Sequence, residues 1–99
     1  MPLVKGSEIP FNVEGRRIVL IDDVLFSGRT VRAALNELSD FGRPRRVELC
    51  VLVDRGNREL PIQADHVAFK LKTSRDDRVV VELTETGAAA DRVVLVKSH

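Results

Sequence analysis

The sequence has little of several residue types. Among its 99 residues there is one cysteine, and there is no tryptophan and no tyrosine. A single cysteine excludes an internal disulfide, and Cys50, in the apolar stretch 47–53, is expected to be a small buried thiol. No apolar run approaches the roughly 20 residues that span a bilayer, which argues against a membrane protein. No targeting segment is visible, so we expect a cytoplasmic protein.

An excess of charge of one sign is also lacking. The sequence has sixteen Lys and Arg residues and fifteen Asp and Glu residues, so its net charge is +1. Any nucleic-acid site therefore has to be local. Two basic clusters could form one, but acidic residues are interleaved and only four Phe side chains could stack on bases, so a solvated surface is the simpler interpretation. The clusters are Arg43, Arg45, Arg46, Arg55 and Arg58, and Lys70, Lys72, Arg75 and Arg78.

Hydrophobic periodicity predicts an α/β fold with a parallel sheet and one βαβ unit. The run 16–25 is rich in β-branched apolar residues, as in a strand covered on both faces. Apolar residues then recur at helical spacing over 31–41, and Gly42 with Pro44 ends that helix. The apolar run 46–54 predicts a second strand, which is expected to lie parallel to the first.

The second half of the sequence predicts a β-rich tail. A loop over 55–64 and a short strand over 65–71 are expected, followed by an antiparallel pair formed by 78–83 and 92–96. We divide the chain, 1–99, as a single partial domain. Its parts are a connector (1–14), the βαβ unit (15–54), and a loop with the β-rich tail (55–99).

Residues 18–30 read IVLIDDVLFSGRT and place two like charges, Asp22 and Asp23, side by side at the end of a predicted buried strand. Repulsion and desolvation disfavour such a pair unless a cation or sugar hydroxyls compensate. Ligands of open α/β sheets bind beyond the carboxyl ends of the strands, where we expect the loop 22–30. Two carboxylates can accept hydrogen bonds from the vicinal hydroxyls of a ribose, directly or beside a Mg²⁺ ion.

The turn Ser27-Gly28-Arg29-Thr30 leads straight into the predicted helix. Backbone amides at a helix start can hold a phosphate, and Gly28 lets the main chain approach it closely. Alternatively, Ser27 or Thr30 is only the N-cap of the helix. The acids and the turn together indicate a sugar-phosphate site.

The motif IVLIDDVLFSGRT resembles the phosphoribosyl-pyrophosphate (PRPP) motif of type I phosphoribosyltransferases. The resemblance implies a truncated Rossmann-like fold of that type, with Mg²⁺ entering with PRPP near the two acids rather than on direct protein ligands. It implies that Asp22 and Asp23 hold the ribose hydroxyls. It also implies that the 5′-phosphate is wrapped by Val24, Leu25, Phe26, Ser27, Gly28, Arg29 and Thr30. Purine salvage enzymes carry an acid where this chain has Phe26, which disfavours a 6-oxopurine substrate.

Nearly the whole chain is similar to the C-terminal part of the PyrR family, pyrimidine operon attenuators with uracil phosphoribosyltransferase activity. The similar stretches are PLVKGSEIPF, GRTVRAALNEL, FGRPRRVELCVLVDRGNRELPIQAD and KTSRDDRVVVEL. This resemblance implies PRPP, UMP or uracil as ligands and pyrimidine-operon mRNA as a partner, with Arg55 facing the base. Alternatively, Arg55 pairs with Asp54 or Asp23.

The family's chains are longer, and their N-terminal half supplies the pyrophosphate-binding loop, a flexible covering loop and part of the sheet. We therefore expect binding of PRPP or UMP with very weak or no transfer, and self-association through an uncovered sheet face. Two alternatives are a non-catalytic nucleotide-sensing or RNA-binding regulator, and a receiver-like module with Mg²⁺ on the paired acids. Asn57 stands where the family usually has His, and ADHVAFKLKTS replaces a stretch resembling ADYVGKNIPTS.

Overall fold

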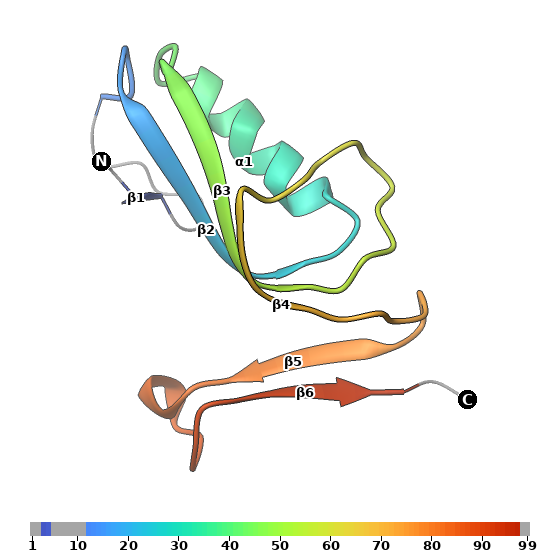
Figure 1. Ribbon diagram of the computed structural model, residues 1–99. Helices are drawn as coiled ribbons and strands as arrows, with labels where there is room; N and C mark the ends of the chain where they lie inside the picture. The colour runs from blue at the N-terminus through green and yellow to red at the C-terminus, as the bar shows by residue number, and fades with distance from the viewer. Residues whose placement is uncertain (1–2, 5–11, 98–99) are drawn as a thin grey trace.

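The computed structural model describes residues 3–4 and 12–97, which form a parallel sheet, one long helix and an antiparallel strand pair (Figure 1). The parallel sheet has the strand order β1-β2-β3-β4. Its strands are β1 (Leu3–Val4), β2 (Arg17–Leu25), β3 (Arg46–Asp54) and β4 (His66–Lys70). The other elements are α1 (Arg29–Ser39), β5 (Arg78–Glu82), a turn of 3-10 helix, η1 (Thr84–Thr86), and β6 (Arg92–Val96).

The predicted βαβ unit is present, since α1 joins two neighbouring parallel strands, β2 and β3. The predicted antiparallel pair is present as β5 and β6. One difference falls within the predicted connector, where Leu3–Val4 pair with β2 as a further parallel strand. The rest of that segment up to residue 11 lies outside the described residues. No helix among the described residues is long and apolar enough to cross a bilayer.

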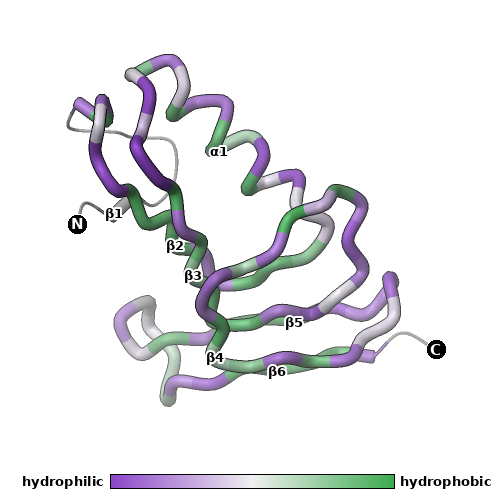
Figure 2. The backbone as a smooth tube through the Cα atoms, turned by 45° about the horizontal axis from the view of Figure 1, so that its top comes forward, coloured by the Kyte–Doolittle hydropathy of each residue, from purple (hydrophilic) through white to green (hydrophobic). Residues whose placement is uncertain are grey.

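The hydrophobic core lies between α1 and the sheet. Val31 and Leu38, seven residues apart on one face of α1, are buried against Leu20 and Leu49 of the central strands. Figure 2 shows the middle parts of β2 and β3 as hydrophobic and their beginnings as hydrophilic. The buried cluster is Val13, Ile18, Leu20, Leu25, Val31, Leu38, Leu49 and Val51.

Two expectations about apolar residues were wrong. Phe41, predicted on the buried face of the helix, is 46% exposed because α1 ends at Ser39 and the backbone turns there. Cys50 is half-buried rather than buried. Its strand has α1 on one side only, and Cys50 lines an open pocket on the sheet.

Candidate functional site

The two adjacent carboxylates lie within β2, not in a loop after it. Asp22 pairs with Val51 of β3, and the ladder continues through Leu25 opposite Asp54. The predicted loop 22–30 is therefore shorter, because the side chain of Leu25 is buried and holds the strand in place. Asp22 is half-buried and Asp23 is exposed. Each accepts a backbone hydrogen bond of 2.8 Å on Oδ1 from the next residue in the chain.

The turn from β2 into α1 is made by a left-handed glycine. Gly28 has φ +93°, is the N-cap residue of α1, and makes no side-chain cap. The amide of Arg29 donates to Oγ of Ser27 over 3.3 Å. The alternative in which Ser27 or Thr30 is the N-cap is thus wrong. Because no side chain caps the start of α1, backbone amides there can bind an anion.

A second loop, which follows β3, clasps this turn. The amides of Glu59 and Leu60 both donate to the carbonyl oxygen of Ser27, at 2.9 and 3.1 Å. Ile62 packs on Gly28 so closely that a Cβ at residue 28 would lie 3.0 Å from its Cγ1. The backbone of the turn is therefore fixed before any ligand arrives.

Arg58 adds a side-chain link between the two loops. Its guanidinium donates to the carbonyl oxygens of Phe26 (2.9 Å) and Ile62 (2.8 Å) and forms a 2.6 Å ion pair with Asp54. Burial alone would raise the pKa of Asp54. The hydrogen bonds from Arg58 and the Gly56 amide, with the charges of Arg58 and Lys70, outweigh burial and hold that pKa below its usual value.

Glu59 bridges two arginines on either side of the turn. Its carboxylate pairs with Arg29 at 2.9 Å and with Arg75 at 3.1 Å. The hydrogen bond from Arg29, against a smaller opposing effect of burial, lowers the pKa of Glu59. Arg29, expected at the phosphate, thus has a carboxylate partner that an anionic ligand would have to compete with.

Arg55 and Phe26, both predicted as site residues, contact each other. The Arg55 guanidinium carbon lies 3.9 Å from the centroid of the Phe26 ring, a cation–π contact. Arg55 is only 5% exposed, and its Nη2 donates to the carbonyl oxygen of Ser74 at 2.9 Å. The alternative pairing with Asp54 is wrong, because Arg58 is the arginine paired with that carboxylate. The buried Nε of Arg55 has no hydrogen-bond partner among the described residues.

Arg55 also lines a pocket of about 420 Å³ beyond the carboxyl ends of β3 and β4. Asn57 spans it, since its side-chain amide donates to the carbonyl oxygen of Thr73 at 2.8 Å. Lys70 and Lys72 add positive charge to the rim. This pocket can receive a flat polar group that offers oxygen acceptors.

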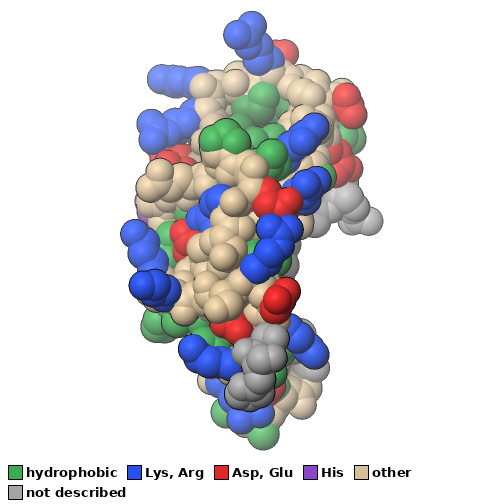
Figure 3. All heavy atoms as spheres, turned by 90° about the vertical axis from the view of Figure 1, so that its right-hand side faces the viewer, with side chains coloured by type: hydrophobic (Ala, Val, Ile, Leu, Met, Phe, Trp, Pro, Cys, Tyr) green, Lys and Arg blue, Asp and Glu red, His purple; other side chains and the backbone are tan. Residues whose placement is uncertain are grey.

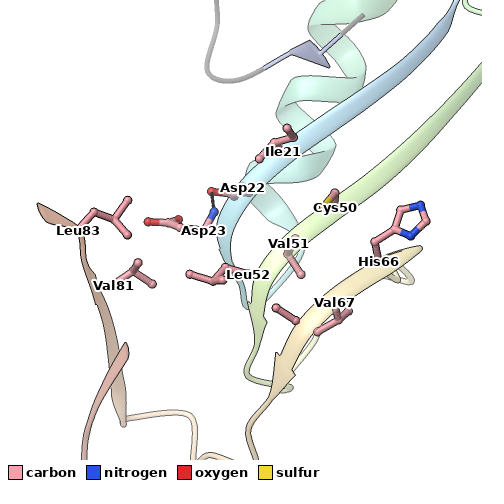
Figure 4. A pocket seen from close by; sticks show the side chains of 11 residues that line it. Ile21, Asp22, Asp23, Cys50, Val51, Leu52, His66, Val67, Val81 and Leu83 are labelled. Atoms are coloured by element: carbon pink, nitrogen blue, oxygen red, sulfur yellow. Dashed lines mark hydrogen bonds between the residues drawn. The ribbon is translucent and has the colours of Figure 1, made fainter. Parts of the chain in front are cut away.

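The other face of the sheet carries a more apolar pocket of about 480 Å³ (Figure 4). Ile21, Cys50 and Val67 form its floor, and Val81 and Leu83 from the tail form its opposite wall. Asp23 lies at the edge nearest these tail residues (Figure 4). Within the described part of the chain, no three His, Cys, Asp or Glu side chains gather as a metal-binding group.

The geometry of strand, acids, glycine turn and helix agrees with a comparison of the sequence with protein families. The model of the phosphoribosyl transferase domain matches residues 3–85, which is most of the chain. The chain belongs to that family. This match confirms the phosphoribosyltransferase family and fold that the motif IVLIDDVLFSGRT predicted.

Among relatives, this phosphoribosyl transferase domain is similar to proteins named bifunctional protein PyrR. The one from Roseiflexus sp. strain RS-1 is 53% identical over 97 residues, which are 98% of this chain and 53% of that protein. The one from Listeria welshimeri is 52% identical over 98 residues, 99% of this chain and 54% of that protein. The chain spans about half the length of these relatives.

Solved structures confirm the type I phosphoribosyltransferase fold. The hypoxanthine phosphoribosyltransferase of Trypanosoma cruzi has a TM-score of 0.69 and 18% identity, over 93% of this chain and 53% of that chain. The enzyme of that name from Staphylococcus aureus has a TM-score of 0.62 and 24% identity, over 74% of this chain and 38% of that chain. At such identities the likeness concerns the fold alone.

Sequence reasoning missed Arg58 and Glu59 as parts of this site. Arg58 was predicted only as part of a basic cluster, and Glu59 belongs to the interleaved acidic residues, although together they hold the turn that the motif describes. The available signal was their position shortly after β3, because β3 ends beside β2, the strand that carries the motif. The roles predicted for Val24 and Leu25 at the phosphate stay predictions, and both are strand residues.

Proposed function

We propose that this chain binds the ribose 5-phosphate portion of PRPP or UMP, as the sugar-phosphate half of a PyrR-like uracil phosphoribosyltransferase and pyrimidine-responsive regulator of transcription attenuation. The observation that carries the proposal is the identity of about half of all positions to PyrR proteins, over almost the entire chain. It is supported by the placement of the acid pair on the strand that feeds directly into the glycine turn.

The two carboxylates have the role of holding the ribose. A carboxylate group can accept about four hydrogen bonds, so Asp22 and Asp23 can each accept bonds from sugar hydroxyls besides the 2.8 Å backbone bonds on their Oδ1 atoms. Asp22 and Asp23 are consecutive residues of a strand, so their side chains leave the strand in different directions. Each carboxylate would therefore bind a different hydroxyl of the ribose. Mg²⁺ would enter with PRPP, take ligands from its oxygens and neutralise charge near the pair.

The 5′-phosphate would lie at the start of α1. The amides of Gly28 and Thr30 and the hydroxyls of Ser27 and Thr30 are the proposed donors there, and the amide of Arg29 would have to exchange its 3.3 Å bond to Ser27 Oγ for the phosphate. The clasp formed by Arg58 keeps these amides in position, which reduces the entropic cost of binding. Arg29 adds charge if the phosphate displaces Glu59.

The base would occupy the pocket lined by Arg55. The unpartnered Nε of this arginine is a donor suited to a uracil carbonyl oxygen, and burial makes a partner valuable there. Phe26 stacks on Arg55 and carries no proton to exchange with a purine ring. A pyrimidine is therefore the proposed base.

Transfer from PRPP to uracil is proposed to be very weak or absent in this chain alone. Charge stabilisation of the leaving pyrophosphate and exclusion of water need a closed site. The relatives have about as many further residues as this chain contributes. The 99 residues contain no segment that corresponds to that other half, so this chain alone would hold PRPP at its ribose phosphate only.

A calorimetric titration with UMP and with Mg²⁺–PRPP, followed by an assay of UMP formation from uracil, tests the proposal. We expect saturable binding of both ligands and little or no turnover. Binding without any turnover favours the non-catalytic nucleotide-sensing alternative for the chain as it stands. Turnover at the rate of a full-length PyrR protein contradicts the argument from the missing half.

Recognition of pyrimidine-operon mRNA is the further part of this proposal. The basic rim of the Arg55 pocket, with Lys70 and Lys72, supports it, because neutralised backbone phosphates contribute most of RNA affinity. An electrophoretic shift of a pyrimidine-operon leader that UMP modulates, with no shift of an unrelated RNA, is the expected result. Equal shifts of both RNAs contradict specific recognition.

A further inference from the structure

Arginines gather at the end of the sheet opposite the proposed ribose site. β2 begins at Arg17 and β3 at Arg46, and these two residues are direct partners in the parallel ladder. Like charges placed opposite each other on neighbouring strands destabilise a sheet. Figure 3 shows Lys and Arg side chains at the upper end of the molecule, where these strands begin. The exposed arginines of this end are Arg16, Arg17, Arg43, Arg45 and Arg46.

The two turns that carry these arginines are joined through their backbones. The amide of Gly15 donates to the carbonyl oxygen of Arg43 at 3.0 Å, and the amide of Arg45 donates to that of Arg16 at 2.9 Å. Gly42, at φ +136°, approaches so closely that a Cβ there would lie 3.1 Å from the amide nitrogen of Glu14. The guanidinium groups therefore project from a fixed base.

Nearby carboxylates compensate only part of this charge. Glu48 pairs with Arg46 at 3.3 Å, and Glu14 accepts a backbone hydrogen bond of 3.3 Å from Arg43. Among the residues that the structure describes, no carboxylate lies within ion-pair distance of Arg17 or Arg45. Positive charge thus accumulates here although the chain as a whole has a net charge of only +1.

A hollow of about 660 Å³ lies between three of these side chains, and its lining consists of Arg17, Arg45 and Arg46. Guanidinium groups match the geometry of phosphate oxygens, which accept paired hydrogen bonds from them. Among the described residues no aromatic side chain lines the hollow, so the guanidinium groups are its main recognition elements. The ligand chemistry that fits is a run of phosphoryl groups.

We propose that Arg17, Arg45 and Arg46 form a second phosphate-binding site for polyphosphate-type anions. It lies one strand length from the turn before α1. β2 has nine residues, and eight strand steps of about 3.3 Å separate the two ends by roughly 26 Å. A single nucleotide at the proposed ribose site does not reach it, so the two sites bind independently.

The test compares Arg17→Gln/Arg45→Gln with a control, Arg78→Gln/Lys97→Gln, which removes the same charge from exposed positions in β5 and directly after β6. The probes are inorganic tripolyphosphate and a short single-stranded RNA, each titrated at low and at physiological salt. Loss of two charge-assisted contacts should weaken tripolyphosphate binding by about tenfold or more. Removal of the same charge elsewhere should weaken it by no more than about twofold.

NMR of the arginine Nε–Hε groups locates the binding. We expect shifts for Arg17, Arg45 and Arg46 on addition of tripolyphosphate, also in Asp22→Asn/Asp23→Asn. UMP binding should be unchanged in Arg17→Gln/Arg45→Gln, which separates this site from the proposed ribose site.

The source of the phosphates follows from the two probes. Competition between RNA and tripolyphosphate identifies nucleic-acid phosphates, and tripolyphosphate binding without RNA binding identifies a small polyanion. Equal losses in the variant and the charge-matched control, or the absence of saturable tripolyphosphate binding at low salt, would overturn the proposal.

Discussion

The guanidinium of Arg58 donates a 2.9 Å hydrogen bond to the carbonyl oxygen of Phe26, across 32 residues of sequence. The same side chain pairs with Asp54 at the end of β3. The loop after β3 and the turn before α1 are therefore one structural unit. Residues that never touch a ligand can thus determine how well the turn holds a phosphate.

Replacement of Arg58 should weaken both the fold and ligand binding. Arg58→Ala removes the donor to Oδ2 of Asp54 and to two carbonyl oxygens, and loss of such partly buried bonds to a charged group costs about 1–3 kcal/mol. Arg58→Lys keeps the charge but cannot reach three acceptors, so it should fall between alanine and wild type.

Urea unfolding and UMP titration, at a temperature where every variant is folded, separate the two effects of Arg58. The control is Arg78→Ala, an exposed arginine on β5. A loss of stability in Arg58→Ala with unchanged UMP affinity would show that the clasp does not position the phosphate turn.

Gly28→Ala should be more harmful than Gly56→Ala. Both glycines have positive φ, +93° and +75°, so alanine pays a backbone cost of roughly 1–2 kcal/mol at each. Only at residue 28 does the new Cβ also meet a side chain, Cγ1 of Ile62 at 3.0 Å, while nothing lies within 4 Å at residue 56.

Chemical denaturation measures this difference, and the double variant Gly28→Ala/Ile62→Ala isolates the steric part from the backbone part. Equal destabilisation by the two alanine substitutions would be incompatible with the close packing of Ile62 on the turn.

The ion pair of Asp54 predicts a loss of stability in acid. The pKa of this carboxyl lies below its usual 3.8 in the folded chain, so the unfolded chain binds the proton first. The stabilisation is complete above the unfolded pKa and disappears as the pH falls through the lower, folded pKa. Unfolding free energies measured from neutral pH to acid should therefore differ most between wild type and Asp54→Asn near neutrality.

The same pH series with Arg58→Ala provides the check on the cause. Without the guanidinium, the carboxyl loses its main stabilising partner, and the acid dependence should become flatter. An unchanged pH profile in Arg58→Ala would assign the acid sensitivity to other groups.

The sheet face opposite α1 should mediate self-association. Ile21 lies in the middle of β2 on this face, is 36% exposed and lines the apolar pocket. Sedimentation velocity over a concentration series should show association that Ile21→Lys reduces. The control Phe41→Lys changes another exposed apolar residue, 46% exposed and beyond the end of α1, and should leave association unchanged. A wild-type chain that stays monomeric at all concentrations contradicts this prediction.

Individual helices and strands could be predicted where the residues of one segment determine its structure without help from distant segments. The predicted strand 46–54 coincides with β3, since its apolar residues bury on a sheet and a turn precedes it. The predicted strand 16–25 agrees with β2, whereas the predicted loop 22–30 was too long, because ladder pairing carries the strand past Asp22 and Asp23 to Leu25. The motif predicted the two acids of the site, Asp22 and Asp23, and the glycine of its turn, Gly28.

Contacts between distant segments were outside the reach of sequence patterns. The clasp of Arg58 on Phe26 joins two loops, and nothing in local spacing distinguishes this arginine from Arg55. The register that sets Arg17 opposite Arg46 depends on how β2 and β3 align, which the sequence does not encode locally. The sequence alone grouped Arg45 with Arg46, but the position of Arg17 beside them emerged only from the fold.

A calorimetric titration of UMP into wild type and into Asp22→Asn/Asp23→Asn tests the proposed ribose-phosphate site most directly. Asp40→Asn/Asp76→Asn serves as the control, since it removes the same charge from exposed positions. We predict saturable binding to wild type and to the control, weakened by about tenfold or more in Asp22→Asn/Asp23→Asn through loss of hydrogen bonds to charged acceptors. Equal UMP affinity in all three proteins, or no binding to any of them, would contradict a ribose-phosphate site on this strand and turn.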